Sequence, residues 1–189
     1  GFYQTEDSDY VKAKQALDHS INKMHELYLL LLNMIAGLQG IAIDRIETAR
    51  KKHIPTQEDL HPNTKFVRNA PLRVLANSKN LQKSSEEVGV GWSKNQELLR
   101  NMFRNLIEDE EYTNYMTSDD RGFKHDKESL VRMFRKNLVN QKVFQDMLEE
   151  ESIFWIDDLD LASSMVIKTI KTIQEEEDEV TLLSVWRDD

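Results

Sequence analysis

One stretch of the chain, from residue 8 to residue 53, carries the strongest hydrophobic pattern. Its apolar residues alternate steps of four and three positions, which is the heptad seam of one helix face. The seam consists of Leu17, Ile21, Met24, Tyr28, Leu31, Ile35, Leu38 and Ala42. More apolar residues flank its middle, between residues 27 and 34, so the helix is apolar there on nearly every side. Because such a helix must be covered by neighbours, the pattern predicts a central helix within a bundle.

The predicted helix is long for the size of the chain. At about 1.5 Å per residue, the stretch would measure about 69 Å. A compact domain of 189 residues has a diameter of roughly 40 Å. We therefore expect either an elongated molecule or a helix that bends at Gly37 and Gly40, with Ser8 as its N-cap. The alternative interpretation of the two glycines is that they admit a neighbouring helix at close range.

Shorter amphipathic segments between about residues 65 and 173 predict the helices that cover the central one. A loop is expected at 54–64, followed by a helix that begins at Pro71 and includes Leu72, Leu75 and Leu81. A capping box of Ser93 and Gln96 begins the next of these helices, and Asp126 begins another. The last helix is expected to be capped by Asp157 or Asp158. Residues 174–189 are expected to form an acidic tail, in which the run 175–179 is solvated and residues 180–189 are too short and isolated to predict. The expected fold is all-α, with residues 1–189 forming a single helical domain around one long N-terminal helix.

Composition indicates the cellular compartment in which the protein is expected. The chain has no cysteine, which fits a reducing, cytoplasmic compartment. Its first residues are polar and acidic, unlike a signal peptide. The longest near-apolar run is 11 residues at 28–38, whereas a bilayer span needs about 20. We therefore expect a cytoplasmic protein with no membrane association.

The net charge of -9 argues against a general nucleic-acid binder, but the acids are clustered. Two runs, 108–111 and 175–179, hold nine of the 34 acidic residues, so the rest of the chain balances 25 acids against 25 bases. Two basic clusters are candidates for contacts with RNA phosphates or a protein partner, and Tyr112 or Tyr115 for stacking on bases. The clusters comprise Arg45, Arg50, Lys51 and Lys52, and Arg132, Arg135, Lys136 and Lys142. The alternative is that both are solvated helix faces.

The sequence gives no support for an enzyme, a cofactor or a metal site. Residues 117–128 imitate a calcium-loop frame, but Arg121 stands where an oxygen ligand is needed. Glu58 and His61 have the spacing of di-iron bundles, which require two such pairs on helices. No cysteine or nucleophile-elbow motif is present, and the five histidines are scattered. A non-enzymatic binding protein is the expectation.

Three segments resemble the long, Bacteroidetes-type form of the transcription antitermination factor NusB. They are the leucine-rich helix at 27–32 (LYLLLL), the run at 49–67 (ARKKHIPTQEDLHPNTKFV) and residues 148–173 (LEEESIFWIDDLDLASSMVIKTIKTI). Together they span the chain from near its start to near its end. Their length and order carry the resemblance, since no catalytic motif is involved.

The resemblance implies an all-helical factor that binds boxA RNA together with the ribosomal protein that doubles as NusE. It also implies that this chain is a fragment, because the arginine-rich first segment of the family and its C-terminal helical half have no counterpart here. No RNA-contacting residue of the family can be mapped onto this sequence. The rival hypothesis is a helical protein-interaction module, in which the heptad seam pairs with a second copy, as a homodimer, or with another protein.

Overall fold

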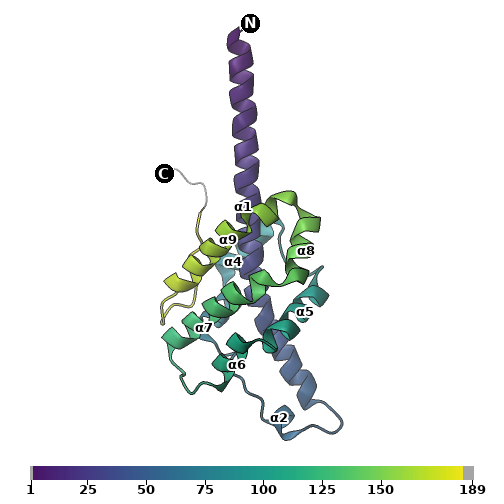
Figure 1. Ribbon diagram of the computed structural model, residues 1–189. Helices are drawn as coiled ribbons and strands as arrows, with labels where there is room; N and C mark the ends of the chain where they lie inside the picture. The colour runs from purple at the N-terminus through teal and green to yellow at the C-terminus, as the bar shows by residue number, and fades with distance from the viewer. Residues whose placement is uncertain (1, 185–189) are drawn as a thin grey trace.

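The computed structural model describes the backbone of residues 2–184 and the side chains of residues 5–184. This part of the chain is all-α, which confirms the expected bundle around one long N-terminal helix (Figure 1). The helices are α1 (Phe2–Arg50), α2 (Gln57–Leu60), α3 (Ala70–Asn77), α4 (Lys79–Val88), α5 (Gln96–Ile107), α6 (Glu110–Thr117), α7 (Phe123–Lys136), α8 (Lys142–Glu151) and α9 (Ile153–Thr172), with a 3-10 turn at Leu138–Asn140.

The middle of α1 is the centre of the core. Tyr28, Leu31 and Ile35 are completely buried, as expected from the seam. Helices α3, α4, α5 and α9 pack around α1, and α7 and α8 reach the core through their contacts with α9. The apolar side chains at 27–32 point in all directions around the helix axis, so each covering helix contacts a different face.

By length and composition alone, α1 also qualifies as a membrane span. An 18-residue window within Thr5–Arg50 has a mean hydropathy of 1.6. The expectation of no membrane association was based on the uninterrupted run at 28–38 alone and therefore did not identify this longer apolar window. In the bundle, 61% of that window is buried against other helices of the same chain. The apolar character of α1 is therefore accounted for by the core that it forms.

The N-terminal part of α1 extends beyond the other helices, so the molecule is elongated (Figure 1). Leu17, the first residue of the predicted seam, is 60% exposed, and Tyr10 is 71% exposed. Ile21 and Met24 are half-buried where α1 enters the bundle. The expectation that the whole seam is buried is thus wrong for its first positions, because the covering helices are too short to reach them.

The segment after α9 returns to the core from Val180 onward, in the stretch for which no structure was predicted from the sequence. Val180 is buried, and Glu179 accepts a hydrogen bond from the backbone N–H of Asn80 at the start of α4 (2.6 Å). The backbone N–H of Leu183 donates to the hydroxyl of Tyr28 (3.1 Å). The acidic residues 175–178 are exposed as expected, and residues 185–189 lie outside the described part.

Tyr28 also joins α1 to α9. Its hydroxyl lies 2.5 Å from the hydroxyl oxygen of Thr169, which in turn donates to the carbonyl of Met165. Since the single proton of Thr169 is used in that bond, Tyr28 is the donor to Thr169. The buried hydroxyl of Tyr28 therefore links α1, α9 and the segment that follows α9. Burial of this hydroxyl raises the pKa of Tyr28.

Several expected helix boundaries are wrong. Ser8 lies inside α1, and the expected loop at 54–64 contains α2. A break at Ser78 divides the helix expected from Pro71 into α3 and α4, and Asn95 rather than Ser93 is the N-cap of α5. Helix α7 begins at Phe123, before Asp126, and α9 begins after Ser152, before Asp157 and Asp158. Side-chain caps explain two of these corrections. The hydroxyls of Ser78 and Ser152 accept from the backbone N–H groups of Leu81 and Phe154.

The two glycines of α1 differ in their surroundings. A Cβ placed on Gly37 would lie 2.7 Å from Cδ2 of Leu99 in α5, whereas a Cβ on Gly40 would meet nothing within 4 Å. Gly37 therefore admits α5 at close range, as the alternative interpretation proposed. Nothing in the packing requires a glycine at position 40.

This difference predicts opposite effects of alanine at the two sites. Gly40→Ala should raise the free energy of unfolding by up to about 1 kcal/mol, because alanine is the better helix former. Gly37→Ala should give no gain or a loss of about 1–3 kcal/mol, because Leu99 is buried and has to move. Urea unfolding of both variants measures the two effects. Equal stabilisation by both substitutions would contradict the close packing of α5 on Gly37.

Candidate nucleic-acid interface

A groove of about 430 Å³ brings together basic side chains of α1 and α5 near the C-terminal end of α1. We call it the basic groove. It is lined by Ile41, Asp44, Arg45, Thr48, Ala49, Lys52, Asp59, Arg100 and Arg104. Four of these side chains are cationic and two are acidic, so the lining carries a net positive charge within a chain that is acidic as a whole.

The cations of the basic groove are held loosely. Arg100 and Arg104 share the exposed carboxylate of Glu97 (3.1 and 3.5 Å), and Lys52 pairs with Asp59 (3.4 Å). The guanidinium of Arg45 lies over the ring of Phe103, 5.7 Å from its centroid. Exposed ion pairs such as those of Glu97 contribute only about 0–1 kcal/mol, so a phosphate can replace this carboxylate at little cost. The Asp59 side chain, by contrast, is only 14% exposed and also caps α2.

The structure places only part of the first predicted basic cluster in this groove. Arg45 and Lys52 line it, while Arg50 and Lys51 are exposed beside it at the end of α1. The sequence reasoning missed Arg100 and Arg104 as members of the site. Their spacing of four residues on the outer face of α5 was the available signal, but only the packing of α5 on α1 brings them to Arg45.

The second predicted cluster is largely paired with acids. Glu111 accepts from both Arg132 (3.3 Å) and Lys136 (3.2 Å), and Lys142 pairs with Asp146 (2.9 Å), which raises the pKa of Lys142. Arg135 is exposed and makes no ion pair within residues 5–184. A role of Arg132, Arg135, Lys136 and Lys142 in RNA or partner contacts stays a prediction.

The tyrosines proposed for base stacking face the core. Tyr115 is completely buried, and its hydroxyl donates to Asp126 Oδ1 (2.6 Å). Burial, together with this bond to a carboxylate, raises the pKa of Tyr115. Tyr112 is half-buried and packs against Phe66 and Phe103. The hypothesis that Tyr115 stacks on a base is therefore wrong, because no face of its ring reaches solvent.

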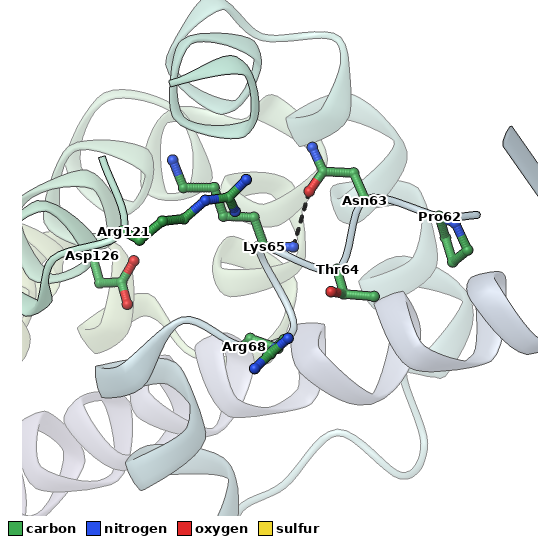
Figure 2. A pocket seen from close by; sticks show the side chains of 7 residues that line it. All are labelled: Pro62, Asn63, Thr64, Lys65, Arg68, Arg121 and Asp126. Atoms are coloured by element: carbon green, nitrogen blue, oxygen red, sulfur yellow. Dashed lines mark hydrogen bonds between the residues drawn. The ribbon is translucent and has the colours of Figure 1, made fainter. Parts of the chain in front are cut away.

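A second hollow, of about 620 Å³, lies between the loop that precedes α3 and the segment that leads into α7 (Figure 2). We call it the loop pocket. It is lined by Pro62, Asn63, Thr64, Lys65, Arg68, Arg121 and Asp126. The backbone N–H of Lys65 donates to the side-chain oxygen of Asn63 (3.0 Å), the bond drawn in Figure 2, and this turn fixes the direction of the loop.

Lys65 is buried and contacts several segments around the loop pocket. Its ammonium donates to the carbonyls of Tyr115 (2.6 Å) and Ser118 (2.9 Å) at the end of α6. It lies 3.4 Å from Nε2 of His125 and 4.4 Å from the centroid of the Tyr115 ring. Burial lowers the pKa of Lys65, and the nearby cation of Arg121 adds to this effect. The amino group therefore ties the loop before α3 to α6 and α7.

Metal binding finds no support in the geometry. Within residues 5–184, no three side chains of the His, Asp and Glu types lie close enough to hold one ion. Arg121, the residue that breaks the calcium-loop frame, lines the loop pocket instead.

Comparison with known proteins gives no further indication of function: no protein-family model, no curated protein and no solved structure matches this chain.

Removing the amino group of Lys65 should destabilise the protein. Lys65→Met leaves the carbonyls of Tyr115 and Ser118 without their donor, and we expect a loss of about 2–4 kcal/mol in the free energy of unfolding. Lys51→Met is the matched control, since Lys51 is exposed and should change stability by less than about 0.5 kcal/mol. Urea unfolding followed by far-UV circular dichroism measures both. A Lys65→Met midpoint equal to that of the unsubstituted chain would contradict the structural role of the amino group.

Proposed function

We propose that this chain is the scaffold portion of a NusB-like RNA- and protein-binding factor in bacterial transcription antitermination. The hydrogen bond between Tyr28 and Thr169 carries the proposal, because it joins two of the three segments that resemble the family. The third segment is fixed to the same helix, since Gln39 of α1 donates to the carbonyl of Val67 (2.9 Å). The resembling residues thus meet in one core, as expected if they encode a common fold.

The arrangement of the surface supports a binding role without catalysis. The bundle holds two features rigidly: the basic groove at one end of α1 and the extended N-terminal part of α1 at the other. Phosphate contacts from arginine and lysine position an RNA without reading its sequence. We therefore assign the basic groove, with Arg50 and Lys51 beside it, to backbone contacts that support a partner which reads the bases.

Salt dependence of RNA binding tests the groove. The chain alone should bind a single-stranded boxA-like RNA weakly, and its affinity should rise when NusE is added. Each neutralised phosphate contact contributes about 0.7 to the slope of log affinity against log salt. Arg45→Gln/Lys52→Gln should therefore reduce the slope by about 1.4, as measured by fluorescence anisotropy. Lys83→Gln/Lys94→Gln removes the same charge from exposed positions elsewhere and should leave it unchanged.

Two results would refute parts of this proposal. An RNA affinity of this chain equal to that of the protein encoded by the full reading frame would refute the scaffold assignment, because the main RNA contacts would then lie within this chain. Absence of salt-dependent binding, with and without NusE, would refute the RNA role of the basic groove.

A second candidate function, a protein-interaction module, is favoured by the exposed seam on α1. Tyr10 and Leu17 are seven residues apart, in the same register as the buried positions that follow, and large parts of both side chains face solvent. A partner helix, from a second copy or from another protein, would extend the packing that the bundle already makes with this face.

Light scattering across a range of protein concentrations tests self-pairing. If the seam pairs two copies, the mass should approach that of a dimer at high concentration, and Leu17→Glu should restore the monomer because a carboxylate cannot be buried in the seam without cost. Ile54→Glu is the control, since Ile54 is equally apolar and 83% exposed but lies outside α1. A strict monomer at every concentration would exclude self-pairing.

A further inference from the structure

The loop pocket contains a buried cation without a carboxylate partner. Lys65 is 5% exposed, and its ammonium is bound to two backbone carbonyls and approached by His125. No ion pair joins Lys65 to any Asp or Glu among the residues that the structure describes. Charged groups in protein interiors are normally paired, because carbonyl dipoles alone compensate poorly for the lost hydration. Asp126, Asp120 and Asp119 favour its charged form from a distance, but none of them forms an ion pair with it.

The lining of the pocket holds more positive than negative side chains. They are three cations, Lys65, Arg68 and Arg121, and one acid, Asp126. Both oxygens of Asp126 already accept internal hydrogen bonds, from the Tyr115 hydroxyl (2.6 Å) and from the backbone N–H of Ala70 (3.1 Å). Neither Arg68 nor Arg121 makes an ion pair within residues 5–184, and both are exposed at the pocket. The lining residues therefore carry a net positive charge, although Asp119 and Asp120 also act on Lys65 from beside the pocket.

The donors of the pocket suit a tetrahedral oxyanion. Arg68 comes from the loop before α3 and Arg121 from the segment before α7, and Figure 2 shows them on two sides of the hollow. A guanidinium presents a planar set of N–H donors that matches two phosphate oxygens at once. The hydroxyl of Thr64 is a further donor in the lining. The volume of about 620 Å³ lies in the range of ordinary ligand sites.

From these observations we infer that the loop pocket binds a phosphate group between Arg68 and Arg121, with Lys65 as the third positive charge. The phosphate is either free or part of a nucleic-acid backbone, since both present the same oxygens to the pocket. This site is separate from the basic groove, and it does not depend on the proposed antitermination function. Lys65 has a structural role whether or not the anion is bound, so Arg68 and Arg121 are the residues to test.

Nuclear magnetic resonance titration of the whole chain tests the site. Sodium phosphate should shift the backbone N–H signals of residues 63–68 and 119–126 in a saturable manner, with a Kd of about 1 mM or tighter. Sodium chloride at the same ionic strength and sodium acetate are the comparison titrations, and neither should give saturable shifts. Phosphate shifts that equal those of chloride, or that do not saturate, would overturn the proposal.

Substitutions then locate the binding. Arg68→Gln/Arg121→Gln should weaken phosphate binding at least tenfold, and thermal unfolding confirms that the variant is folded, as expected for two exposed side chains. Lys83→Gln/Lys94→Gln removes two positive charges from exposed positions outside the pocket and should leave the affinity unchanged. Equal affinities of the two double variants would overturn the assignment to Arg68 and Arg121.

A short single-stranded RNA distinguishes the two sources of phosphate. If the RNA shifts the same signals and inorganic phosphate competes with it, the pocket holds a backbone phosphate. If inorganic phosphate binds and the RNA leaves these signals unchanged, the ligand is a free phosphate. Loss of RNA binding at the basic groove would leave the phosphate titration unaffected, so failure of the proposed function is recognised separately.

Discussion

Burial of the leucine-rich middle of α1 is the constraint on which the rest of the structure depends. Residues 27–32 are apolar on all sides of the helix, so no single neighbour can cover them. Helices α3, α4, α5 and α9 all pack against α1 and together cover these residues. Two tryptophans fix the arrangement, since the indole N–H groups of Trp92 and Trp155 donate to the carbonyls of Leu30 and Lys23 in α1. The bundle is thus organised by contacts with one helix.

The length of α1 then decides where the exposed apolar positions and the basic groove are found. The covering helices bury only its middle, so both ends extend beyond the core (Figure 1). One end carries the exposed positions Tyr10 and Leu17, and the other carries Arg45 and Lys52 beside α5. A continuous helix of 49 residues therefore connects these two surfaces.

A buried polar network, independent of α1, shapes the loop pocket. Lys65, Tyr115 and Asp126 come from three segments, and their hydrogen bonds join the loop before α3 to α6 and α7. Asn69 completes the network by donating to the carbonyl of Asp126 (3.0 Å). Such networks define one arrangement of the loops, because any other would leave buried donors or acceptors without partners. Arg68 and Arg121 lie in backbone segments that this network joins.

The sequence by itself determined the central helix, the all-α class and the helical positions that face the core, such as Leu72 and Phe134, because periodicity is a local property of the chain. Tertiary structure decided that the first positions of the α1 seam, such as Leu17, stay exposed. It also decided that the backbone of Leu183 hydrogen-bonds to Tyr28 and that Arg100 and Arg104 line the same groove as Arg45. The burial of Tyr115 is a further result of the tertiary packing. These outcomes depend on contacts between residues far apart in the chain, whose partners no local pattern specifies.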